Sequence, residues 1–316
     1  MNDWQLDKLD KATRDAFGEA LKAVGAENPR IVVLDADLSV STKSATFGKA
    51  FPDRFFQMGI AEQNMVGTAA GLAFTGFVPF LCSFGAFVAG RFETIRVSVG
   101  YSQANVKIVG THAGLGIGED GYTQMGLEDV AVMRAIPGMT VLQPCDAAST
   151  FAAVKWAAQH SGPVYLRLTR QKLPKVYADP SVFQGGRGIV LREGKGLALV
   201  GSGAGTAEAM RAARDLKDRN PWVVDMPTLK PLDRALVRRL ATDCKAIVTV
   251  EDHSIIGGLG SAMAEVLAEE GFGGRLVRVG LQDTYGQSGQ AEELYERYGL
   301  SAKKIVERVR SLPQFS

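Results

Sequence analysis

One glutamate stands where proton exchange with a ligand would be possible. Glu62 lies in the segment Gln57-Met-Gly-Ile-Ala-Glu-Gln-Asn-Met65, at the start of a predicted helix that follows a short extended stretch. Burial of a carboxyl group raises its pKa by disfavouring the charged form, and such a group can share a proton with a ligand. An acid at this place is also a common helix cap, because the helix dipole favours negative charge there. The segment alone supports both interpretations equally.

Two aromatic residues stand at the end of a predicted strand. Phe84 and Phe87 lie in Pro79-Phe-Leu-Cys-Ser-Phe-Gly-Ala-Phe87, three residues apart, so they could share one face of a helix. Rings at this spacing usually belong to a hydrophobic core. Ligands of α/β proteins bind at the carboxyl ends of strands, so this pair could also hold a ligand.

A glycine-rich loop follows another predicted strand. His112 lies at its start, Glu119 and Asp120 lie near its end, and four glycines from Gly114 to Gly121 permit close backbone approach to a ligand. A simple connecting loop needs neither a histidine at a strand end nor two acids, so the pattern favours a binding loop. The glycines do not match a dinucleotide-binding fingerprint, because the third glycine is out of register and no helix follows at once.

The elements that must position these residues alternate between short apolar strands and longer helical patterns. Strands are predicted at 31–35, 78–83, 106–110, 140–143 and 164–168, and helices at 8–24, 61–75, 86–99, 127–135 and 147–160. Such alternation predicts an α/β fold with mostly parallel sheets flanked by helices.

A second series of strands and helices begins after a segment rich in proline and glycine. Its strands are predicted at 197–200, 222–225, 246–250 and 276–279, and its helices at 206–217, 232–241 and 258–269. We therefore predict two domains, at 1–172 and 195–316, joined by a linker at 173–194.

Two motifs of the second domain indicate turns rather than sites. Gly201-Ser-Gly-Ala-Gly205 is an incomplete dinucleotide pattern and is typical of a tight strand-to-helix turn. Val250-Glu-Asp-His253 precedes a glycine cluster, and its adjacent acids and single histidine do not form a metal-binding face. We interpret this second motif as a strand-to-helix turn at a possible subunit contact.

The bulk composition excludes several classes of protein. With 46% apolar and 22% charged residues the chain is not disordered, and a net charge of +2 argues against nucleic acid or an anionic membrane as partner. The three cysteines, Cys82, Cys145 and Cys244, show no disulfide or zinc spacing. No apolar run is long enough to span a bilayer and the N-terminal segment is unlike a secretory signal, so we expect a cytoplasmic protein.

Taken together, these segments resemble the pyrimidine-binding and C-terminal domains of the transketolase family, in the family's order and over essentially the whole chain. Met58–Met65 resembles the motif of the glutamate that meets the thiamine aminopyrimidine, and Ser83–Val88 the aromatic segment beside that ring. Thr111–Gly121 is similar to the substrate loop. Leu168–Pro174 resembles the phosphate-side arginine motif, and Ala12–Arg14 and Asp37–Ser41 match further contacts.

The resemblance implies a role for each matching residue. Glu62 and His112 would be catalytic, and the cofactor would contact Glu62, Phe84, Phe87 and Asp37. The substrate would contact Arg14, Ser41, His112, Asp120, Gln124 and Arg170. Gln124 departs from the family pattern, which has a histidine there, so substrate contacts at that place are expected to differ. No metal ligand is implied in this chain.

The resemblance also implies partners. The cofactor would be thiamine diphosphate, but the sequence has no match to the Gly-Asp-Gly motif with which transketolases hold the diphosphate and its metal. We therefore expect an N-terminal diphosphate-binding subunit to hold Mg²⁺ or Ca²⁺, and two copies of each chain to form a heterotetramer. The activity implied is transfer of a two-carbon ketol unit between sugar phosphates of the pentose phosphate type.

Three alternatives remain open at this point. The chain could be the beta subunit of a 2-oxo-acid dehydrogenase, which has the same two-domain build but no need for His112, Asp120 or the two arginines. It could be a transketolase for a branched or sulfonated sugar, to which Gln124 would be a clue. It could also be a non-catalytic structural homologue, although such a protein has no need to retain Glu62 and the aromatic pair.

Overall fold

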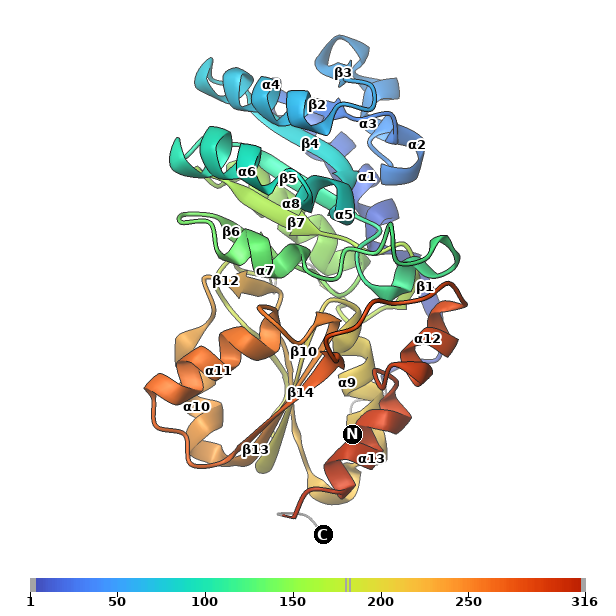
Figure 1. Ribbon diagram of the computed structural model, residues 1–316, viewed down its shortest axis with the longest axis vertical. Helices are drawn as coiled ribbons and strands as arrows, with labels where there is room; N and C mark the ends of the chain where they lie inside the picture. Colours follow the sequence, from blue (N-terminus) through green and yellow to red (C-terminus); the bar gives the residue numbers. More distant parts are fainter. Residues whose placement is uncertain (1–3, 180, 182, 314–316) are drawn as a thin grey trace.

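The computed structural model has two large sheets flanked by helices, one above the other along its long axis (Figure 1), and in its described residues a further sheet of two strands. The structure describes residues 4–179, 181 and 183–313. Residues 180 and 182 of the predicted linker, and 1–3 and 314–316 of the two predicted domains, lie outside this part. The α/β fold with mostly parallel sheets is confirmed.

The first sheet positions the predicted site. Among the described residues it has seven strands in the order β12-β6-β7-β5-β4-β2-β3. Its strands are β2 (Ile31–Asp35), β3 (Phe55–Gln57), β4 (Val78–Phe84), β5 (Lys107–Thr111), β6 (Thr140–Leu142), β7 (Val164–Arg167) and β12 (Thr228–Lys230). All neighbours except β12 and β6 are parallel. Because helices cover both faces, β2, β4, β5 and β7 are buried along their whole length.

Helices of the first domain pack on both faces of this sheet. They are α1 (Thr13–Glu27), α2 (Ser39–Thr42), α3 (Ala45–Ala50), α4 (Glu62–Phe74), α5 (Gly85–Ala89), α6 (Phe92–Ile95), α7 (Asp129–Arg134) and α8 (Ala147–Gln159), with 3-10 turns η1 (Pro52–Arg54) and η3 (Leu115–Asp120) and a π-helical turn η2 (Arg96–Tyr101). One core cluster joins residues of α1 and α8 to the strands, among them Phe17, Leu21 and Val154.

The second sheet has the order β14-β13-β10-β11-β9 in the described part of the chain. Its strands are β9 (Ile189–Arg192), β10 (Gly196–Ser202), β11 (Trp222–Asp225), β13 (Cys244–Ser254) and β14 (Arg275–Leu281). Only β9 is antiparallel to its neighbour. The accompanying helices are α9 (Ala204–Asp215), η5 (Lys217–Arg219), α10 (Arg234–Asp243), α11 (Leu259–Glu269), α12 (Ala291–Arg297) and α13 (Ala302–Arg310).

Several segments cross between the two sheets. β12 follows β11 in the chain but pairs with β6 of the first sheet. β1 (Leu9–Ala12) pairs with β8 (Lys172–Pro174), and Leu6 packs in the core of the second sheet. Strand β9 and two of the three residues of β8 also fall inside the segment predicted as a linker. The domain boundaries given above therefore stay a prediction.

Three predictions of local structure were wrong. The helix predicted at 8–24 begins only at Thr13, because 9–12 form β1, and the helix predicted at 86–99 is divided into α5, α6 and η2. The motif around Asp252 is not a strand-to-helix turn: Glu251, Asp252 and His253 belong to β13 itself and are buried there. No helix in the described residues is long and apolar enough to cross a membrane.

Candidate functional site

The predicted site residues lie along one edge of the first sheet. Strands β7, β5, β4, β2 and β3 are neighbours and run parallel, so their carboxyl ends meet at that edge. The residues at or just after these ends are, in the same order, Arg170, His112, Phe84, Asp37 and Glu62. Parallel α/β sheets bind ligands at this edge.

Glu62 is the first residue of α4, and its side chain is 7% exposed. Its Oε1 accepts a hydrogen bond of 3.4 Å from Ser83 Oγ. In the described residues it forms no hydrogen bond with the first amides of α4, so it is not a helix cap. A carboxylate can accept about four hydrogen bonds, and this one has capacity left for a ligand.

Three rings form a stack where β4 and β5 end. The Phe84 and Phe87 rings lie 5.3 Å apart with an interplanar angle of 14°, and the Phe84 and His112 rings lie 3.8 Å apart at 25°. The two phenylalanines do not share a helical face, because Phe84 ends β4 and only Phe87 belongs to α5. Phe84 is buried between two neighbours, whereas Phe87 is partly exposed and can offer its ring to a ligand.

His112 is buried, and its backbone has a left-handed conformation, with φ of 57°. Its Nε2 contacts Arg14 Nη1, and its Nδ1 lies 2.8 Å from Thr111 Oγ1. Arginine can only donate, so Nε2 is the acceptor and Nδ1 carries the proton of the neutral ring. Thr111 in turn donates to the Ser83 carbonyl at 3.3 Å. Burial, together with the charges of Arg14, Arg170 and Lys43, lowers the pKa of His112 to about 3.

The neutral state of His112 predicts a pH dependence of stability. Between its ordinary pKa of 6.5 and about 3, the unfolded chain takes up a proton that the folded chain does not, so the free energy of unfolding falls as pH falls. Replacing His112→Gln should lessen this slope by up to about 1.4 kcal/mol per pH unit. Urea denaturation between pH 4 and 7.5 measures it, and an unchanged slope would contradict the assignment.

Three cations converge around His112. Arg14 Nη1 also donates to the Ser41 carbonyl at 3.2 Å, and its Nε is buried without a partner. Arg170 Nη1 lies 3.0 Å from Asp120 Oδ1. Lys43 Nζ lies 3.3 Å from Asp15 Oδ1. Guanidinium groups with unused donors match the geometry of a phosphate or sulfonate group.

A buried aspartate holds the loop that brings Ser41 and Lys43 to this place. Asp35 ends β2, and its Oδ2 accepts hydrogen bonds from Thr42 Oγ1 at 2.7 Å and Ser44 Oγ at 2.8 Å. Its Oδ1 accepts one from the Leu38 amide at 2.7 Å. Burial raises the pKa of Asp35, and these donors oppose that rise.

Not every predicted residue joins these contacts. In the described part of the chain, the side chains of Asp37, Ser41 and Gln124 form no hydrogen bond or ion pair with the other predicted site residues. The structure adds Ser83, Thr111 and Lys43, which were not assigned roles from the sequence. Ser83 and Thr111 stand inside the recognised motifs, whereas nothing in the local pattern around Lys43 marks it.

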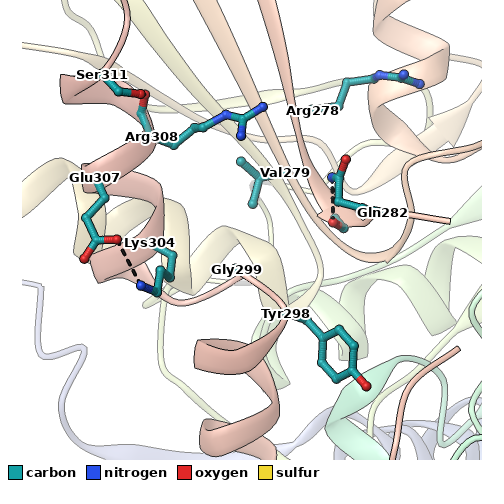
Figure 2. A pocket seen from close by; sticks show the side chains of 10 residues that line it. Arg278, Val279, Gln282, Tyr298, Gly299, Lys304, Glu307, Arg308 and Ser311 are labelled. Atoms are coloured by element: carbon teal, nitrogen blue, oxygen red, sulfur yellow. Dashed lines mark hydrogen bonds and ion pairs between the residues drawn. The ribbon is translucent and has the colours of Figure 1, made fainter. Parts of the chain in front are cut away.

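A separate cavity of about 380 Å³ lies in the second domain (Figure 2). Arg278 of β14 and Lys304 and Arg308 of α13 line it, and no predicted site residue does. Lys304 Nζ lies 3.0 Å from Glu307 Oε2 (Figure 2). Arg278 Nη1 donates to the Ile255 carbonyl at 2.9 Å. Two of its cations therefore have protein partners, and we assign no ligand to it. The described residues contain no group of three acids, histidines or cysteines that could hold a metal ion.

Comparison with known proteins identifies two domain families in the chain. Residues 10–176 match the transketolase pyrimidine-binding domain family, and residues 186–305 match the transketolase C-terminal domain family. A solved structure described as a split gene transketolase, inactive beta4 tetramer, is 50% identical, with a TM-score of 0.89 and coverage of 97% of this chain and 99% of that one.

Two curated relatives differ in length. A Clostridium protein named 6-deoxy-6-sulfo-D-fructose transketolase subunit SqwH is 41% identical over 93% of this chain and 92% of its own length. Human transketolase is 39% identical over 95% of this chain, but the match spans only 49% of the human protein. On these domain matches, identities and coverage, the chain belongs to the transketolase family and carries its pyrimidine-binding and C-terminal domains.

Proposed function

We propose that the chain is the C-terminal subunit of a thiamine-diphosphate-dependent transketolase that moves a two-carbon ketol unit between phosphorylated sugars. One observation carries this proposal. A Glu62 carboxyl that does not cap its helix, the partly exposed Phe87 ring and the neutral His112 all lie at one edge of the first sheet. Each group suits one part of the chemistry that the family performs.

Glu62 and Phe87 fit the aminopyrimidine of the cofactor. The carboxyl has capacity to bind the ring nitrogen N1′, and the Phe87 ring can stack on the pyrimidine, an offset contact that contributes about 0.5–1.5 kcal/mol beyond burial. Thiamine diphosphate supplies a nucleophilic thiazolium carbon for carbon–carbon bond cleavage. Phe84 would support Phe87 from behind, and Asp37 would lie toward the thiazolium side.

The substrate would lie between the cations and the glycine-rich loop. Arg170 and Arg14 would bind the terminal phosphate with help from Ser41, since guanidinium donors pair with phosphate oxygens. His112 and Asp120 would bind sugar hydroxyls. Gln124 would complete the site with an amide, which can form hydrogen bonds but cannot carry a proton at neutral pH.

A partner subunit would complete the site. The described residues offer no metal-binding group, and a relative of nearly the same length is named a transketolase subunit. Two apolar side chains, Val40 and Ile60, are 77% and 84% exposed beside Asp37 and Glu62. A diphosphate-binding subunit that covered the site would bury them and hold Mg²⁺ or Ca²⁺. Two copies of each chain and a cytoplasmic location remain parts of the proposal.

A reconstitution assay tests the proposal. The purified chain would be mixed with an N-terminal transketolase section, thiamine diphosphate and Mg²⁺. Ketol transfer from xylulose 5-phosphate to ribose 5-phosphate is expected for the mixture and for neither subunit alone. Full activity of this chain alone would overturn the split site. Turnover of a 2-oxo acid instead of the sugar would favour the dehydrogenase alternative, and preference for 6-deoxy-6-sulfofructose would favour a sulfosugar donor.

Arg170→Ala is expected to weaken the binding of phosphorylated donors selectively. Loss of a charge-assisted hydrogen bond costs about 1.5–3 kcal/mol, so KM should rise by roughly tenfold to a hundredfold for a phosphorylated ketose. An unphosphorylated ketose should be affected little. Steady-state kinetics of the reconstituted enzyme measure both donors, with Lys155→Ala on the exposed face of α8 as the control. Equal losses for the two donors would remove Arg170 from the phosphate site.

A further inference from the structure

A carboxylate from the second sheet, that of Asp252, binds the glycine-rich loop that follows strand β5 of the first sheet. Asp252 lies near the carboxyl end of β13 and is fully buried. Its Oδ1 accepts a hydrogen bond of 2.7 Å from the Leu115 amide, and its Oδ2 accepts one of 3.2 Å from the Gly116 amide. These are the first two amides of η3, which have no partners within the turn itself. The first amides of the turn that ends at Asp120 therefore donate to a carboxylate of the other domain.

Gly114 permits this close approach. Its φ is 87°, and a Cβ built there would lie 2.2 Å from Asp252 Oδ2. Any larger residue would force the carboxylate and the loop apart. On the opposite side, Arg167 Nη2 donates to the Asp252 carbonyl at 3.0 Å and so holds the end of β13.

A second group of contacts runs from Asp252 to the strand end that carries Arg170. Tyr295 of α12 donates to Asp252 Oδ2 at 2.8 Å, and its hydroxyl accepts a hydrogen bond of 2.6 Å from Gln171 Nε2. Gln171 directly follows Arg170, whose Nη1 donates to the Ile117 carbonyl at 2.9 Å and to Asp120 at 3.0 Å. The contacts thus form a closed ring that passes through Asp252, the loop, Arg170 and Tyr295.

Asp252 acts as an acceptor in this ring of contacts. The two amides can only donate, and the Tyr295 hydroxyl donates to the same oxygen as the Gly116 amide. Burial raises the pKa of Asp252, while the Arg167 charge and these hydrogen bonds lower it. A buried carboxylate that accepts three hydrogen bonds is costly to alter, because each donor would lose its partner.

We propose that Asp252 is a positioning residue for the substrate site: it holds η3 directly and the Arg170 strand end through Tyr295 and Gln171, and so sets where Asp120 and Arg170 meet. The substrate part of this inference rests on the proposed function, whereas the loop contacts do not. The second domain thereby takes part in substrate binding without touching the sugar.

Two measurements on Asp252→Asn test the inference. In the isolated chain, hydrogen exchange of residues 115–120 should become faster. In the reconstituted enzyme, KM for a phosphorylated donor should rise by about tenfold to a hundredfold, because a small displacement of binding groups has effects of that order. The kcat at saturating donor and the affinity for thiamine diphosphate should change little.

The neighbouring Glu251→Gln is the matched control. Glu251 is equally buried and also accepts two backbone amides, Leu259 at 2.6 Å and Gly260 at 2.8 Å, but it contacts α11 instead of the loop. This variant should lose stability without faster exchange at 115–120 or a raised donor KM. Equal effects of the two variants would reduce Asp252 to a structural role and overturn the inference.

Tyr295→Phe keeps the test decisive if Asp252→Asn does not fold. This variant removes only the hydrogen bonds that the Tyr295 hydroxyl forms with Asp252 and Gln171. The KM for the donor should therefore rise by a larger factor than the factor by which kcat falls. Unchanged loop exchange in Asp252→Asn, or an unchanged donor KM in a folded variant, would overturn the inference. If the wild-type mixture shows no ketol transfer, the proposed function fails instead, and the exchange experiment still decides whether Asp252 holds the loop.

Discussion

Glu62→Gln is expected to reduce the kcat of the reconstituted enzyme by about 10²–10⁴-fold, the usual contribution of a positioned acid or base. Glutamine has the same shape and can bind a ring nitrogen, but it cannot exchange a proton with it. The fold should survive, because in the described residues the carboxyl accepts one hydrogen bond, at 3.4 Å from Ser83, and caps no helix. Initial rates at saturating donor and acceptor, with melting temperature and partner affinity as checks, measure the effect.

The control for this substitution is Glu93→Gln, a glutamate in the first turn of α6 that is exposed. It is also a glutamate in the first turn of a helix, but it does not follow one of the strands whose ends carry the predicted site residues, so the rate should not change. Ser83→Ala should have an intermediate effect, since it removes the one hydroxyl that orients the Glu62 carboxyl. A Glu62→Gln enzyme with more than a tenth of the wild-type kcat would exclude Glu62 as the activating acid.

Asp129→Ala is expected to destabilise the chain by about 3–5 kcal/mol, the usual cost of removing one partner of a buried ion pair. Arg167 Nε donates to Asp129 Oδ2 at 2.8 Å, and both side chains are completely buried. Tyr165 donates to the same oxygen at 2.6 Å. Burial by itself would raise the pKa of Asp129, but the charges of Arg167 and His253 and these hydrogen bonds lower it. The variant leaves the Arg167 charge buried without a carboxylate.

Urea denaturation of the isolated chain at pH 7 measures this loss. The control is Glu265→Ala. Glu265 is exposed, and its Oε2 lies 2.8 Å from Arg134 Nη2. This substitution should change the free energy of unfolding by about 1 kcal/mol or less. Because the pKa of Asp129 is lowered on folding, its contribution is present above its ordinary pKa of 3.8 and is lost as pH falls through the lower folded value. Equal effects of the two variants would contradict a stabilising role for the buried pair.

Short strands were the elements that local sequence predicted best. The strands predicted at 31–35 and 222–225 agree with β2 and β11 residue for residue. Runs of β-branched and apolar residues buried on both faces have few other ways to fold in an α/β chain. β1 was missed because its partner β8 lies about 160 residues away, as the pairing of Lys11 with Leu173 shows, and no local pattern reveals such a pairing.

The site was predictable in its residues but not in its contacts. Segments matching a known family indicated Glu62, Phe87, His112 and Arg170, and the strand order brings them to one edge. The sequence did not show that His112 stacks on Phe84 or that Arg14 meets its Nε2. Such contacts depend on side chains from different strands, and their spacing along the chain carries no information about them.

Glu62 and Asp252 mark the division between what the sequence determined and what the tertiary structure decided. The sequence by itself determined that Glu62 begins a helix at a strand end in a transketolase-like motif. It left open whether the carboxyl caps that helix, and the Ser83 contact decided the question. It indicated a strand-to-helix turn at Asp252, and only the packing of the two domains revealed a buried carboxylate that accepts hydrogen bonds from the glycine-rich loop. Burial and hydrogen-bond partners are properties of the assembled fold, because Ser83 lies 21 residues from Glu62 and Leu115 lies 137 residues from Asp252 along the chain.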